Sequence, residues 1–108
     1  MYKVLLDENL PVKIKFRLQD VCDIFTVKDM DWNALENGDL INAMEKDGFD
    51  FLITSDKNLQ YQQNLAARRI SIIVLTTTSW PRIQKRLGDV VSAIASAIPC
   101  GHIEITIP

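Results

Sequence analysis

Two stretches of this 108-residue chain finish in the same chemical way. In "LLDENLP" an apolar run stops at Asp7, and in "FLITSDKNLQ" a second apolar run is closely followed by Asp56. Each aspartate precedes polar residues that could begin a helix, where a carboxylate accepts backbone N–H bonds and contributes about 1 kcal/mol. Helix capping could explain either aspartate alone, whereas a shared acidic site would explain both.

A third acid, Asp39, falls in the first turn of the predicted helix "GDLINAMEKDG", where the helix dipole also favours a negative charge. Three crowded carboxylates repel one another, and a cation is the natural resolution. Oxygen ligands without histidine or thiolate favour Mg²⁺ or Mn²⁺ over zinc. Because such an ion polarises a phosphoryl oxygen and helps to form hydroxide, the pattern predicts phosphodiester hydrolysis.

Polar neighbours of these acids are secondary candidates. Glu8 is expected either to contact the metal or to be a turn residue. Asn58 either ligates through water or starts a helix. Three further residues could orient the aspartates by hydrogen bonds, namely Asn9, Thr54 and Ser55.

The elements that must position these residues alternate along the chain. Short apolar runs predict strands at residues 2–6, 23–27, 49–54 and 71–76, with an edge strand at 102–107. Helices are predicted at residues 38–48 and 56–69, and one continuous helix follows Pro81 and ends at Pro99. Residues 11–20 fit both a strand and a helix period, and we choose helix because a parallel neighbour needs a crossover.

This alternation predicts a single α/β domain over residues 1–108, with a mainly parallel sheet flanked by helices. Right-handed crossovers are compatible with a strand order of about 2-1-3-4, followed by the C-terminal edge strand. Such an order reverses between strands one and three and opens a crevice at their carboxyl ends. Asp7 and Asp56 are expected at those two ends, with Asp39 near the same rim.

Composition narrows the class of protein. Hydrophobic residues make up 47% and charged residues 24% of the chain, as in ordinary globular proteins. No apolar run is long enough to cross a membrane and the first residues lack a signal peptide's layout, so we expect a cytoplasmic protein without membrane association. A pI near 5.2 excludes a globally basic nucleic-acid binder. A local basic surface for RNA phosphates could still form from Arg68, Arg69, Arg82, Lys85 and Arg86.

"LLDENLP" together with "GDLINAMEKDGFDFLITSDKNL" resembles the PIN-like nuclease superfamily, in particular small PIN-like proteins with an Asp-Glu-Asn-Leu-Pro motif. The resemblance extends to VapC-type toxins of bacterial toxin–antitoxin pairs. It implies a three-layer α/β fold and Mg²⁺- or Mn²⁺-dependent cleavage of RNA, with Asp7, Asp39 and Asp56 as the metal-binding and catalytic acids. An antitoxin protein and a second copy of the chain are candidate partners.

The chain departs from that family at two places. Members often carry a second acid two positions after the aspartate of the Thr-x-Asp motif, where this chain has Asn58. The additional mid-chain acid has no clear counterpart, although Glu36 is a candidate. Two alternatives to a ribonuclease therefore stay open, namely a non-catalytic PIN-like module that binds RNA or protein, and a receiver-like phospho-accepting switch.

Overall fold

A computed structural model of the chain describes residues 1–57, 69–96 and 102–108. The helices are α1 (Lys13–Leu18), α2 (Asn37–Lys46), α4 (Trp80–Gln84) and α5 (Leu87–Ser96). The strands are β1 (Lys3–Leu6), β2 (Asp23–Thr26), β3 (Phe51–Thr54), β4 (Ser71–Leu75) and β5 (His102–Ile105). They form one parallel sheet of order β2-β1-β3-β4-β5, which confirms the predicted fold class and strand order.

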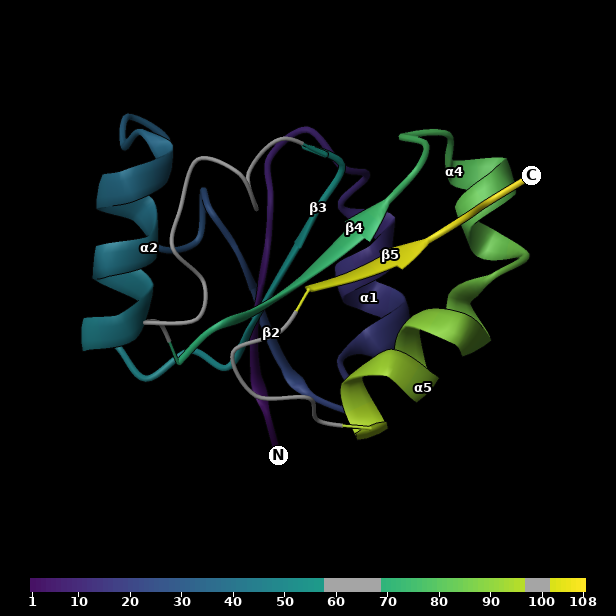
Figure 1. Ribbon diagram of the computed structural model, residues 1–108, viewed down its shortest axis with the longest axis horizontal. Helices are drawn as coiled ribbons and strands as arrows, with labels where there is room; N and C mark the ends of the chain where they lie inside the picture. Colours follow the sequence, from purple (N-terminus) through teal and green to yellow (C-terminus); the bar gives the residue numbers. More distant parts are fainter. Residues whose placement is uncertain (58–68, 97–101) are drawn as a thin grey trace.

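The central strands β1, β3 and β4 are buried on both faces, as continuous apolar strands require. On β1, Val4 and Leu6 pack into one apolar cluster, while Leu5 between them packs into the other. The first cluster contains buried residues of α1, α4 and α5, and the second contains those of α2. Figure 1 shows the resulting three layers, with α2 on one side of the sheet and α1, α4 and α5 on the opposite side.

The helix predicted between Pro81 and Pro99 is instead two helices, so that prediction is wrong in its continuity. Arg86 N donates to the Ile83 carbonyl at 2.9 Å and Asp89 N donates to the Arg86 carbonyl at 3.0 Å. These bonds span three residues rather than four, so the chain tightens between α4 and α5. The apolar period survives because Ile83 and Leu87 are both buried.

The end of the chain behaves as the predicted edge strand. β5 pairs in parallel with β4 and, among the residues that the structure describes, has no second neighbour in the sheet. Ile105 and Ile107 are buried, whereas Glu104 and Thr106 are exposed, which is the period-two pattern of a strand with one covered face.

Two other predictions can be placed against the structure. Residues 58–68 of the helix predicted at 56–69 lie outside the described residues. In the described part of the chain, no helix is long and apolar enough to span a membrane.

Candidate functional site

The sheet topology brings Asp7 and Asp56 to neighbouring strand ends. β1 and β3 pair directly, with Leu6 in register with Ile53. Asp7 follows the last residue of β1, and its backbone N–H extends the ladder by donating to the Ile53 carbonyl at 2.9 Å. Asp56 lies two residues beyond the end of β3. Both aspartates therefore lie at the carboxyl edge of the sheet, where its order reverses direction.

One buried hydroxyl connects the two loops that carry these aspartates. Thr54 is fully buried, and its Oγ1 donates a 2.6 Å hydrogen bond to Oδ2 of Asp7. The same Oγ1 accepts the backbone N–H of Asp56 at 3.1 Å. Thr54 thus fixes one carboxylate oxygen of Asp7 and, at the same time, the backbone position of Asp56.

A second contact joins the same loops nearer to solvent. Asn9 Nδ2 donates to Oγ of Ser55 at 2.7 Å, a contact between residues 46 positions apart. Asn9 and Ser55 therefore contact each other across the two loops, while Thr54 donates to Asp7 and accepts the backbone N–H of Asp56. Asn58 lies outside the described residues.

Helix capping does not account for Asp7. α1 begins at Lys13 and its N-cap position is Val12, which makes no side-chain cap. Besides Thr54, the Asp7 carboxylate accepts the backbone N–H of Glu8 through Oδ1 at 2.9 Å, and the Asp7 carbonyl accepts Leu10 N at 3.1 Å. Asp7 therefore shapes a turn after β1 and presents its carboxylate toward β3.

Asp39 does not complete a three-carboxylate site. It lies in the first turn of α2, as predicted, but is exposed. Among the described residues, no three acidic, histidine or cysteine side chains are placed to share a metal ion. Glu36 occupies the N-cap position of α2 without forming a side-chain cap. The path of residues 27–36 sets where α2 begins, and nothing in the sequence pattern specifies that path.

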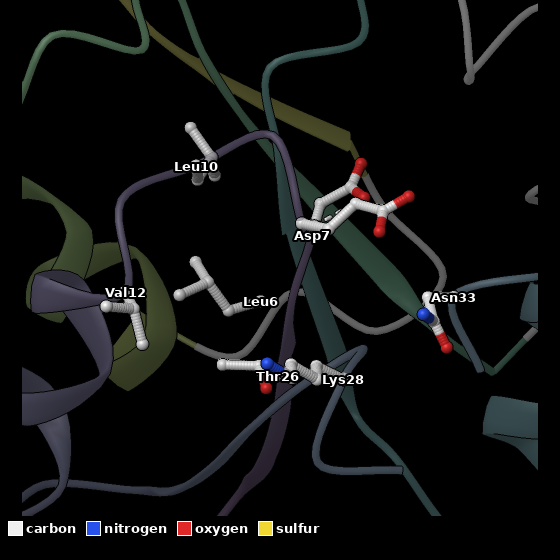
Figure 2. A pocket seen from close by; sticks show the side chains of 8 residues that line it. Leu6, Asp7, Leu10, Val12, Thr26, Lys28 and Asn33 are labelled. Carbon is white, nitrogen blue, oxygen red and sulfur yellow. Dashed lines mark hydrogen bonds between the residues drawn. The ribbon is translucent and has the colours of Figure 1, made fainter. Parts of the chain in front are cut away.

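A pocket of about 220 Å³ opens beside Asp7, between the carboxyl ends of β1 and β2 (Figure 2). Asp7 and Glu8 line its acidic side. The remaining lining residues are Leu6, Leu10, Val12, Thr26, Lys28 and Asn33. None of these six was a sequence-based candidate, because they come from three separate segments whose proximity only the folded sheet creates.

The basic residues divide between two places. Arg82, Lys85 and Arg86 gather around a hollow of about 390 Å³ that Pro108 also lines. Arg86 is partly engaged by Asp89, with 3.8 Å between the guanidinium and carboxylate atoms. Arg82 lies on α4, and Lys85 and Arg86 directly follow that helix. α4 comes after the carboxyl end of β4, which is the same edge of the parallel sheet as the end of β1 (Figure 1).

Arg69 lies apart from Arg82, Lys85 and Arg86 and lines a different hollow. It precedes β4, near the amino edge of the sheet, and shares a hollow with Asn42, Glu45 and Lys46. Its backbone N–H donates to Oε2 of Glu45 at 3.4 Å. Arg69 is therefore not grouped with Arg82, Lys85 and Arg86, and Arg68 lies outside the described residues.

The donor set at the carboxyl edge fits a hard divalent cation held by few protein ligands. Mg²⁺ is usually bound by one or two carboxylates, with substrate phosphates and waters completing the shell. Asp7 and Asp56 supply two carboxylates on adjacent loops, and Glu8 is the nearest further acid in the sequence. No protein-family model, curated protein or solved structure matches the chain.

Proposed function

We propose that the protein is a metal-dependent ribonuclease whose reaction centre lies between Asp7 and Asp56. The observation that carries the proposal is the Thr54 hydroxyl, which bonds the Asp7 carboxylate and the backbone of Asp56 together at the crevice of a parallel sheet. Ligands of open α/β sheets bind at this kind of crevice.

Each residue has a defined task in this proposal. Asp7 and Asp56 would hold Mg²⁺ or Mn²⁺, which when bound polarises a phosphoryl oxygen and lowers the pKa of water. Thr54 donates to one oxygen of Asp7 and so orients that carboxylate, while Asn9 and Ser55 keep the two loops together. Arg82, Lys85 and Arg86 would contact phosphates of the RNA strand along the same edge.

The sequence resemblance to VapC-type toxins motivates the biological part of the proposal. We propose that the chain is the toxin of a toxin–antitoxin pair and acts on RNA in the cytoplasm. Induced expression should then arrest growth in a manner that depends on Asp7 and Asp56. Co-expression of the small open reading frame next to the gene should relieve the arrest if it encodes the antitoxin. Equal growth with unmodified and Asp56→Asn protein would contradict the toxin role.

A direct cleavage assay tests the enzymatic proposal. Single-stranded RNA incubated with the purified protein and Mn²⁺ should be cut slowly, and a chelator should stop the reaction. Asp7→Asn and Asp56→Asn should abolish cleavage, whereas Asp39→Asn should retain most of it because Asp39 lies outside the pair. Equal metal-dependent cleavage by the unmodified protein and Asp7→Asn would show that this site does not cut the RNA and would contradict the proposal.

A non-catalytic RNA-binding module is the second candidate. It is favoured by the small number of acids at the site, because Asp7, Asp39 and Asp56 do not form one metal-binding group in the described residues. Unmodified protein that binds RNA but never cuts it, with either metal, would support this candidate. A receiver-like switch shares the strand order, but that pattern needs a lysine at the end of a late strand, and "SIIVLTTT" has none.

A further inference from the structure

We propose that the pocket beside Asp7 holds one unpaired base of the RNA strand and so selects single-stranded substrate. This inference rests on the proposed ribonuclease function, since the base would belong to a nucleotide whose phosphate lies near Asp7. The pocket occupies the side of Asp7 that faces β2, while Asp56 lies on the side that faces β3.

The size of the pocket favours a small flat group. Its volume of about 220 Å³ lies below the range of about 300–1,000 Å³ that holds drug-sized ligands. A single base is smaller than such a ligand, whereas a base pair would not enter. Proteins read single-stranded RNA by accepting splayed-out bases in this way.

The lining combines an apolar floor with a polar rim. Leu6 and Leu10 are only 1% and 5% exposed, so they close the floor of the pocket but leave little of their own surface open to a base. Val12 is 50% exposed and lies at the margin of the pocket. In Figure 2, these apolar side chains lie to one side of the pocket, with Asn33 on the opposite side and Thr26 and Lys28 below.

The polar residues suit the rest of a nucleotide. The amide of Asn33 has both donors and an acceptor, which a base edge requires. Lys28 supplies a cation for a phosphate close to the acidic side chains of Asp7 and Glu8. The pocket therefore has separate groups for the face, the edge and the phosphate of one nucleotide.

Its β2 wall is fixed before any ligand binds. Asp29 Oδ2 accepts the backbone N–H of Thr26 at 2.9 Å and Nζ of Lys15 at 2.5 Å, while Thr26 Oγ1 accepts Asp29 N at 3.0 Å. Lys15 belongs to α1, so this contact holds the turn after β2 against the helix that begins beside Val12. A preformed pocket loses less entropy on binding than one that must be ordered.

The test uses a sugar–phosphate strand without bases and the same strand with one central base, both made with phosphorothioate linkages to resist hydrolysis by water. Fluorescence anisotropy in Mg²⁺ gives both affinities. The single base should tighten binding to the unmodified protein by about tenfold, the gain expected when roughly 55 Å² of apolar surface is removed from water. Val12→Trp, which fills the pocket, should lose this gain.

Phe16→Trp is the matched control, because Phe16 is 58% exposed one turn further along α1 and does not line the pocket. It should keep the full gain. Asn33→Ala should reduce the differences in affinity among the four bases, while Gln19→Ala, another exposed amide, should not. Thermal melting verifies that each variant is folded. If Val12→Trp does not fold, the comparison of Asn33→Ala with Gln19→Ala tests the pocket instead.

Two results would overturn the inference, namely no gain from the base in the unmodified protein or an equal gain in Val12→Trp. Cleavage assays on the same proteins separate this failure from failure of the ribonuclease proposal. Metal-dependent cleavage without a gain from the base would reject the pocket alone. A gain from the base without cleavage would support the pocket and reject the nuclease.

Discussion

Oγ1 of Thr54 lies 2.6 Å from Oδ2 of Asp7, although 47 positions separate the two residues in the sequence. Thr54 is the last residue of β3 and Asp7 follows the last residue of β1, so the contact records the direct pairing of these two strands. A fully buried hydroxyl must have a partner, and here the partner is a carboxylate at the edge of the sheet. The hydrogen bond that satisfies the buried Thr54 hydroxyl therefore also orients the Asp7 carboxylate of the candidate site.

Thr54→Val should destabilise the protein by about 1–3 kcal/mol, because it removes the donor to Asp7 and the acceptor for the Asp56 N–H without changing the side-chain shape. Thr54→Ser keeps the hydroxyl and should cost only the lost methyl group, about 1 kcal/mol. Urea denaturation measures both values. A Thr54→Val protein as stable as the unmodified one would show that the hydroxyl contributes nothing to folding.

Mn²⁺ or Mg²⁺ should raise the melting temperature, because an ion that binds only the folded state stabilises it by mass action. An ion at 100 times its dissociation constant stabilises by about 2.7 kcal/mol. Asp7→Asn and Asp56→Asn should lose the response, and Asp39→Asn should keep it, since Asp39 is exposed on α2 and forms no group with the other two. Differential scanning fluorimetry with and without chelator measures the shift.

The control for that experiment is Asp20→Asn, which removes an exposed acid from the turn after α1. It should respond to metal as the unmodified protein does. If Asp39→Asn were the variant that lost the response, the ion would bind at α2, and the Asp7–Asp56 pair would not be the metal site.

The periodicity of apolar residues predicted the architecture well because burial on both faces of the sheet leaves a strong pattern. Residues 11–20 fit the period of a strand as well as that of a helix. In α1, Ile14 and Leu18 are buried at helical spacing, whereas Phe16 between them is 58% exposed. A strand would have buried all three on one face. The need for a crossover between parallel strands, rather than local propensity, decided the assignment correctly.

The candidate site was predictable only where it follows from strand ends. The sequence predicted that Asp7 and Asp56 lie at the same edge of the sheet, because each follows a predicted strand and these strands were expected to be neighbours. β1 and β3 do pair directly. The position of Asp39 depends on a long connection that includes Asp31 at a positive φ of 59°. The pocket depends on side chains from three segments. Nothing in the sequence around Asn33 or Lys28 distinguishes these two residues from other polar surface residues. Tertiary packing alone places them.

Asp29→Asn should lower stability slightly at neutral pH, and the difference should shrink in acid. The hydrogen bond from Lys15, followed by that from the Thr26 backbone, lowers the pKa of the Asp29 carboxyl in the folded protein. A lowered folded-state pKa gives stability that is present above the unfolded-state pKa and lost as the pH falls through the folded-state value. The pair is partly exposed, so its contribution should stay below about 1 kcal/mol.

Urea denaturation between pH 7 and pH 2 measures this difference. Asp20→Asn is the control, because it removes another exposed carboxylate. Asn keeps an acceptor for the Thr26 N–H but loses the charge that attracts Lys15. An Asp29→Asn penalty that grows as the pH falls would have the wrong sign and would contradict the assigned role of the ion pair.

RNA binding should depend on salt through Arg82, Lys85 and Arg86, because each cation that meets a phosphate releases counterions from the strand. Changing one of them to glutamine should lower the slope of log K against log salt by roughly 0.7, the value for one contact with a single strand. Arg69→Gln removes the same kind of charge near the amino edge of the sheet and should leave the slope unchanged. Anisotropy titrations over a series of salt concentrations, with a non-cleavable strand, give the slopes of the unmodified protein and of the four variants. A reduced slope in Arg69→Gln, together with unchanged slopes in Arg82→Gln and Lys85→Gln, would mean that RNA crosses the opposite edge of the sheet, away from Asp7.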